Sequence, residues 1–214
     1  MRFRDRDDAG RRLAERLMIL RAHDPIVLGL PRGGVPVAAR VADALGAELD
    51  VLVVRKLGAP GRAEFAMGAI GEDGSRFVDE RSVRLLGVTS DRLDEIERLE
   101  RAELERRVQQ YRPGRPRLDL AGRTAIVVDD GVATGATAIV ACRAARSYGA
   151  SSVVAAMPVA PAAWEWTLAG EADALVAVTT PTDFVAVGQW YADFRQTTDD
   201  EVVAVLAAHP RAGA

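Results

Sequence analysis

Short apolar runs alternate along the chain with segments of helical periodicity, and this alternation limits the fold more than any other feature. Buried strands are predicted over residues 26–30, 49–54, 124–128, 152–159 and 174–179. Helical patterns cover residues 35–46, 136–148 and 161–170. A strand, a helix and a second strand in that order form a βαβ unit, and repeated units build a parallel sheet. Since continuous Val, Ile and Ala runs are typical of strands covered on both faces, we expect an α/β fold.

The segment between the two halves of this pattern is different. Residues 66–79 predict a hairpin with Asp73-Gly74 as its turn, and residues 91–108 predict a strongly charged helix. The apolar stripe of that helix is too short for sustained heptads, so a solvated surface helix is favoured over a coiled coil. At the N-terminus, residues 7–21 predict a helix that Asp7 or Asp8 caps.

With 214 residues, the chain is expected to form one domain over residues 1–214. We assign the core to about 24–62 and 122–180, an insertion to 63–121 and a C-terminal hood to 181–214.

Composition excludes several classes of protein. The single cysteine, Cys142, rules out an internal disulfide and a multi-cysteine metal cluster. A pI near 5.5 disfavours a general nucleic-acid binder, and no stretch reaches the roughly 18 apolar residues of a membrane span. The first residues lack the apolar core of a secretory signal, so a cytoplasmic protein is expected. Of the 28 basic residues only Lys56 is a lysine, which makes it conspicuous.

The most informative stretch lies at residues 124–137. A buried strand ends in Asp129 and Asp130, and a loop of small residues then runs directly into a helix. Loops at the carboxyl ends of parallel strands are where open α/β sheets bind ligands. The free N–H groups of the following helix favour an anion, and Thr134 and Thr137 add hydroxyl donors.

The two carboxylates narrow the ligand further. They would repel a phosphate unless they face something else, and either ribose hydroxyls or a divalent cation would suit them. A ribose 5-phosphate fits both halves of the loop at once. The alternative is an ordinary strand-to-helix turn with an aspartate cap, which needs only one acid.

The stretch VVDDGVATGAT resembles the phosphoribosyl-pyrophosphate (PRPP) motif of type I phosphoribosyltransferases. The resemblance implies a doubly wound, mainly parallel sheet with a small hood, here with an inserted hairpin and charged helix. It implies that Asp129 and Asp130 contact the ribose 2- and 3-hydroxyls. It also implies a loop that holds the 5-phosphate, formed by Ala133, Thr134, Gly135, Ala136 and Thr137.

Residues 30–34 resemble the loop with which that family holds pyrophosphate. Gly33 and Gly34 would let backbone N–H groups approach the anion, and Arg32 could bind it through two N–H groups. After the predicted strand 49–54 come Arg55 and Lys56, where the family carries basic residues followed by a mobile loop. The resemblance therefore implies Lys56, Arg55 and Asp130 as catalytic residues. For Arg55 and Lys56, an ordinary solvated strand end stays open as the alternative.

Residues 181–195 resemble the C-terminal segment of hypoxanthine-guanine phosphoribosyltransferases. By that match, Phe184 would stack on a base and the backbone of Val185 would contact the edge of the base. For Trp190, Tyr191 and Phe194, packing of the hood is favoured over contact with a ligand.

Together these features predict a phosphoribosyltransferase that moves the 5-phosphoribosyl group of PRPP to a nitrogen acceptor, with a nucleobase favoured, and releases pyrophosphate. Mg²⁺ is the expected cofactor and would arrive with PRPP, so no metal site on the protein is predicted. The expected partners are PRPP and a small nitrogenous acceptor, without nucleic acid or membrane, and a homo-oligomer stays open. The alternative is a regulatory protein that senses PRPP or a nucleotide without turnover.

Overall fold

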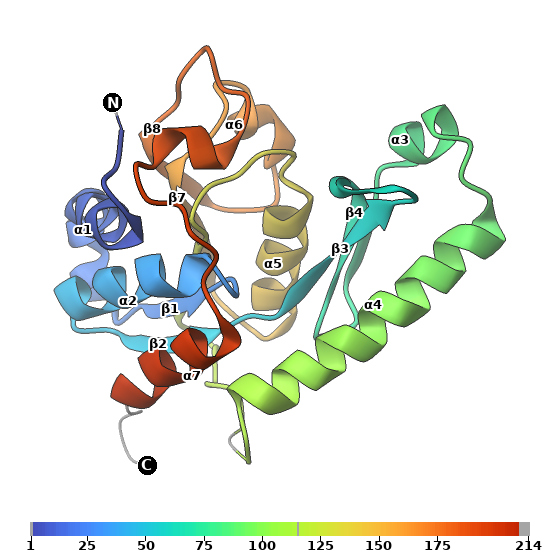
Figure 1. Cartoon of the computed structure of the whole chain (residues 1–214). Helices are drawn as coiled ribbons and strands as arrows, with labels where there is room; N and C mark the ends of the chain where they lie inside the picture. The colour runs from blue at the N-terminus through green and yellow to red at the C-terminus, as the bar shows by residue number, and fades with distance from the viewer. Residues whose placement is uncertain (1, 115, 210–214) are drawn as a thin grey trace.

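Five parallel strands form the central sheet of this computed structural model, in the order β2–β1–β6–β7–β8 (Figure 1). The structure describes residues 2–114 and 116–209, with only the backbone for residues 62–65. The strands of this sheet are β1 (Ile26–Gly29), β2 (Glu48–Val51), β6 (Thr124–Val128), β7 (Ser152–Val159) and β8 (Ala174–Thr179). The predicted α/β fold with a mainly parallel sheet is confirmed.

Helices cover both faces of this sheet. Alternate side chains of β6 point to opposite faces, so Ala125 and Val127 pack on the α5 side while Ile126 and Val128 pack on the α1 and α2 side. Both faces are therefore buried, as the unbroken apolar runs predicted. These helices are α1 (Arg6–Leu17), α2 (Gly34–Leu45) and α5 (Ala136–Ser147).

The strand expected over residues 49–54 is divided between two sheets, which corrects the sequence prediction. β2 ends at Val51, and Val54 begins β3, so Arg55 and Lys56 lie within a strand and not beyond its end. The strands of the second, antiparallel sheet are β3 (Val54–Ala59), β4 (Arg62–Gly71) and β5 (Arg76–Val78). Leu52 and Val53, which connect the two strands, are both buried. The apolar run therefore continues across the junction, and the sequence pattern does not indicate where one strand ends and the next begins.

The hairpin predicted over residues 66–79 is confirmed, because β4 and β5 pair around the turn at Asp73-Gly74. The family resemblance implies a mobile loop after Lys56, and this segment forms the tip of the β3–β4 hairpin, with Pro60 and Gly61 as its turn.

Helix boundaries differ at two other places. α1 begins one residue earlier than expected, and its cap is Asp5, whose carboxylate accepts the N–H of Asp8 at 2.8 Å. A 3₁₀ helix, η1 (Met18–His23), replaces its last turn, and the helix expected over 161–170 shortens to α6 (Trp164–Thr167). The remaining elements are α3 (Glu80–Leu85), α4 (Ser90–Tyr111), η2 (Val187–Trp190) and α7 (Asp199–Ala208). Among the described residues, no helix is both long and apolar enough to cross a membrane.

The long charged helix α4 runs beside the second sheet and returns toward α7 (Figure 1). Leu93, Leu104 and Tyr111 are buried in the cluster that includes Leu57 of β3. Leu99 is 57% exposed, so the stripe passes instead through Glu100, which binds Arg55. One face of α4 therefore covers a sheet, and the helix is more than a solvated surface element.

A buried ion pair fastens this insertion to the central sheet. Arg112, which follows α4, binds Glu72 at the end of β4 and lies 3.9 Å from Asp50 of β2. Burial raises the pKa of Glu72, and the charge of Arg112 opposes that rise. Removing one member of a buried pair is costly because the other charge is left without its partner.

Replacement of Arg112 tests this anchor. We expect Arg112→Met to lower the free energy of unfolding by about 3–5 kcal/mol at neutral pH, measured by urea denaturation. Because Glu72 can take up a proton in acid, the loss should shrink as the pH falls. Adding Glu72→Gln should restore part of the stability. The control, Arg92→Met, breaks only an exposed pair with Glu95 and should cost at most about 1 kcal/mol. Equal effects of the two single variants would contradict the anchor.

Candidate functional site

A cleft of about 780 Å³ lies along the carboxyl edge of β1 and β6, facing the second sheet. It is lined by most of the site residues that the sequence predicted: Arg32, Gly33, Arg55, Lys56, Asp129, Asp130, Ala133, Thr134, Gly135, Thr137 and Val185. Gly34, Ala136 and Phe184 do not line it. The fold thus brings three segments that are far apart in the sequence to one cleft: the glycine loop after β1, the start of β3, and the acid pair with the loop that follows it.

The glycine loop after β1 packs directly on the acid pair after β6. A Cβ atom on Gly33 would lie 2.0 Å from Oδ2 of Asp130, and one on Gly34 would lie 2.6 Å from the carbonyl oxygen of Val128. No larger residue fits at either position without displacing its neighbour. Gly34 does not line the cleft, but its lack of a side chain allows the glycine loop to pack against the end of β6.

Each carboxylate of the pair commits one oxygen to the protein. Oδ1 of Asp129 accepts the backbone N–H of Asp130 at 2.8 Å. Oδ2 of Asp130 accepts the Nε–H of Arg6 at 2.8 Å, and Nη2 of Arg6 lies 2.7 Å from the same oxygen in an ion pair. Within the described part of the chain, no partner is recorded for Oδ2 of Asp129 or Oδ1 of Asp130. The pair thus keeps two acceptor oxygens for a ligand.

The surroundings of the pair make its ionised form costly. Burial, followed by the charge of Asp130, raises the pKa of Asp129. Burial also raises the pKa of Asp130, against the opposing charges of Arg6 and then Lys56. Two adjacent carboxylates in such a place gain from a ligand that donates hydrogen bonds to them.

The loop from Ala133 to Thr137 leads into the N-terminus of α5. Gly135 precedes the helix with φ at 82°, and a Cβ atom there would lie 2.6 Å from a methyl carbon of Thr167. Among the described residues, no backbone partner is recorded for the N–H groups of residues 133–137. These N–H groups, with the positive end of the helix, suit a phosphate.

Positive side chains lie across the cleft from this loop. Lys56 is exposed on β3, and Arg55 beside it binds Glu100 of α4 at 2.7 Å. Arg32 lies 3.8 Å from Asp199 at the start of α7. Arg107 of α4 also lines the cleft, a residue that the sequence analysis did not single out.

The hood contributes fewer groups than the sequence suggested. Val185 is 84% exposed in the cleft, but its backbone N–H already binds the side chain of Gln189 at 3.0 Å. Phe184 packs with the hood cluster of Phe3, Trp190 and Tyr191, outside the cleft lining. The expected packing roles of Trp190 and Tyr191 are confirmed, whereas Phe194 also lines the cleft.

Sequence reasoning missed two supports of Asp130. Arg6 reaches it from α1, and the hydroxyl of Tyr191 donates to its carbonyl oxygen at 2.6 Å. Arg6 is 124 positions away in the chain, and no local pattern marks it. The bridge between Phe3 and Tyr191 brings the N-terminal segment and the hood together at this place.

No preformed metal site accompanies the acid pair in the described residues. There, no group of three or more His, Cys, Asp or Glu side chains could hold an ion.

Comparisons with known proteins identify the class to which this fold and cleft belong. Residues 5–174 match the family model of the phosphoribosyl transferase domain, so the chain belongs to that family. Two Mycobacterium tuberculosis proteins, provisionally named phosphoribosyl transferases, are each 54% identical over 204 residues. The match covers 95% of this chain but 46% of theirs, so the chain spans about half their length.

Among solved structures, the protein TT1426 from Thermus thermophilus is similar over nearly its whole length. It is 45% identical in sequence with a TM-score of 0.80, covering 98% of this chain and 99% of that one.

The raised pKa of Asp129 predicts that its charge destabilises the protein without ligand. An acid whose folded pKa exceeds the unfolded value loses stability as the pH rises through that interval. Asp129→Asn should therefore melt higher than wild type at pH 8 and about equally at pH 4. Each kcal/mol relieved should raise the melting temperature by about 2–4 °C.

A matched control is Asp79→Asn, because a hydrogen bond from Ser82 lowers the pKa of Asp79. This variant should gain nothing at pH 8. If Asp129→Asn melted at or below wild type at pH 8, the carboxylate pair would not be under the electrostatic strain described.

Proposed function

We propose that the chain is a phosphoribosyltransferase that moves the 5-phosphoribosyl group of PRPP to a nitrogen acceptor. The observation that carries this proposal is the pair of acceptor oxygens, Oδ2 of Asp129 and Oδ1 of Asp130, beside the N–H groups that open α5. They match two adjacent ribose hydroxyls and a 5-phosphate, which is the polar outline of a ribose 5-phosphate. The roles assigned to Asp129, Asp130 and residues 133–137 rest on this match.

The leaving group would lie toward the glycine loop and the second sheet. Gly33 places backbone there without a side chain, and Arg32, Arg55 and Lys56 supply positive charge. When bound on the pyrophosphate oxygens, Mg²⁺ would add further positive charge to the leaving group.

In the proposed reaction, the bond between C1 and the pyrophosphate oxygen breaks, and its electron pair leaves on pyrophosphate. The lone pair of the acceptor nitrogen forms the new bond to C1, and the nitrogen loses its proton to solvent. The protein contributes orientation and fixed charge, and needs no covalent nucleophile. Asp130 acts by holding the ribose next to the breaking bond.

The acceptor would enter at the hood end of the cleft, beside Val185 and Met157. A nucleobase suits the apolar lining there, and since the N–H of Val185 is engaged by Gln189, the carbonyl of Val185 would contact its edge. Stacking by Phe184 would require that side chain to leave the hood cluster.

A second candidate function is a sensor that binds PRPP without turnover. The pairing of Arg55 with Glu100 favours it, because that cation is already neutralised and less able to stabilise a leaving pyrophosphate. The two functions share the acid pair and the phosphate loop, and differ in whether pyrophosphate is released.

The deciding experiment measures both binding and turnover. Binding of PRPP with Mg²⁺ is followed by calorimetry, and pyrophosphate release is followed across a panel of nucleobases. Saturable binding with release for at least one base supports the transferase. Binding with no release for any base supports the sensor, and no binding contradicts both.

Lys56→Ala tests the leaving-group role. We expect turnover to fall by roughly 10²–10³, the usual effect of removing one preorganised donor, with a much smaller change in PRPP affinity. Arg81→Ala, at an exposed position of α3 outside the cleft, is the control and should behave as wild type. Equal losses in turnover and affinity would assign Lys56 to binding alone.

A further inference from the structure

The side chain of Arg6 connects three parts of the molecule that the sequence keeps apart. It starts on the first turn of α1 and is only 12% exposed. Its Nε donates to Oδ2 of Asp130, its Nη2 forms an ion pair with the same oxygen, and its Nη1 donates to the carbonyl oxygen of Arg195 at 2.7 Å. Its guanidinium also lies 4.2 Å from the ring centre of Phe194. All three nitrogens of Arg6 are therefore engaged.

The contacts of Arg6 select one oxygen of the Asp130 carboxylate. Oδ2 contacts Nε and Nη2 of Arg6. It also lies against the backbone of Gly33, so close that a Cβ atom on Gly33 would collide with it. Oδ1 of Asp130 makes no hydrogen bond or ion pair with the described residues. A carboxylate held in this way cannot rotate freely, so its unpaired oxygen keeps one direction.

We propose that Arg6 is a positioning residue of the phosphoribosyl site: it binds Oδ2 of Asp130 so that Oδ1 is presented to a ribose hydroxyl. The inference rests on the proposed function and deepens it. In this role Arg6 acts on the substrate through Asp130 and not through a contact of its own.

Electrostatics gives Arg6 a second effect on the same carboxylate. The charged groups that act on Asp130 are Arg6 from α1, Lys56 from β3 and Asp129 from its own loop, while the neutral hydroxyl of Tyr191 contacts its carbonyl from the hood. Arg6 is the foremost influence opposing the rise that burial causes in the pKa of Asp130. Without Arg6, the carboxyl should stay protonated to higher pH.

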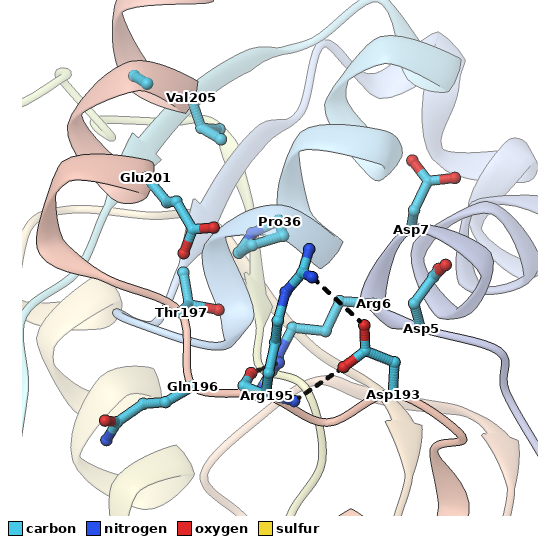
Figure 2. Close-up of a pocket in the computed structure, with 11 residues that line it drawn as sticks. Asp5, Arg6, Asp7, Pro36, Asp193, Arg195, Gln196, Thr197, Glu201 and Val205 are labelled. Atoms are coloured by element: carbon cyan, nitrogen blue, oxygen red, sulfur yellow. Dashed lines mark hydrogen bonds and ion pairs between the residues drawn. The ribbon is translucent and has the colours of Figure 1, made fainter.

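A second cavity, of about 430 Å³, lies on the other side of Arg6 (Figure 2). Figure 2 shows Glu201 and Val205 of α7 on one side of it and Asp5 and Asp7 on the other. Arg6 lines both this cavity and the main cleft, so its guanidinium forms part of the wall between them. If the side chain is shortened, a small guanidinium ion can reach the vacated place from the second cavity.

The test compares Arg6→Ala and Arg6→Lys with a control variant, Arg11→Ala. Arg11 is an exposed arginine of the same helix, and it pairs with Asp7. PRPP affinity is measured by calorimetry with Mg²⁺, with and without millimolar methylguanidinium. We expect Arg6→Ala to weaken PRPP binding by about 10–100-fold, the usual cost of a lost charge-assisted contact, and Arg6→Lys to fall between it and wild type. Arg11→Ala should match wild type.

Two readouts separate positioning from a general loss of structure. Methylguanidinium should strengthen PRPP binding to Arg6→Ala several-fold and leave wild type and Arg11→Ala unchanged. The pH at which Arg6→Ala reaches half of its maximal affinity should lie above that of wild type, because Asp130 must lose its proton. If Arg6→Ala does not fold, the same pH shift in Arg6→Gln, which removes the charge but keeps most of the side-chain length, carries the test.

Failure of the inference differs from failure of the proposed function. If wild type binds PRPP and a folded Arg6→Ala binds it equally well, Arg6 is not a positioning residue. The inference is also overturned if the loss in Arg6→Ala shows neither rescue by methylguanidinium nor a pH shift. If wild type itself does not bind PRPP, the proposed function fails and the inference fails with it.

Discussion

The site depends on two neighbouring carboxylates that the fold holds at the end of a buried strand. Burial raises the pKa of both Asp129 and Asp130, and the charge of Asp130 raises that of Asp129 further, so their ionised forms cost the folded protein free energy. Several features reduce that cost or hold the pair in place: the ion pair with Arg6, the charge of Lys56 and the glycine backbone packed on Asp130. The two oxygens that remain without protein partners are where a ligand with hydroxyl groups would gain most.

The opposite wall of the cleft belongs to a different sheet. The chain leaves the central sheet after Val51 and enters the antiparallel sheet at Val54, carrying Arg55 and Lys56 across the cleft from the acids. Arg112 fastens this wall near the same junction through Glu72, and α4 holds Arg55 through Glu100. The second sheet thus forms one side of the site, and α4 fixes the position of Arg55.

Much of this arrangement was predictable from local patterns. The strand boundaries at 124–128 and 152–159 follow from apolar runs because those strands are buried on both faces. The apolar run at 174–179 marks β8 although that strand is only partly buried, and Gly46 marks the C-terminal end of α2 through its left-handed backbone conformation. The acid pair and its loop could be found for the same reason, since the chemistry lies within about a dozen consecutive residues.

The parts that sequence reasoning missed depend on contacts between distant segments. The change of sheet at 52–53 cannot be detected in the sequence pattern. Leu52 and Val53 are both buried, as they would also be in a single continuous strand. Arg6 is one of 27 arginines, and only the folded chain shows that it meets Asp130 rather than solvent. Likewise, Glu100 takes the place of the exposed Leu99 on the inner face of α4 because it meets Arg55 there.

The two walls divide the proposed chemistry between them. The acids and the phosphate loop belong to the parallel sheet, and in the proposed function they would hold the ribose 5-phosphate. Stabilising a departing pyrophosphate needs positive charge from Arg55 and Lys56, which the second sheet carries. Binding and turnover therefore rest on separate structural units joined at residues 52–53 and 112. A chain of this fold could lose turnover through its second sheet and keep a working binding site, so the transferase and the sensor differ by the state of one wall of the cleft.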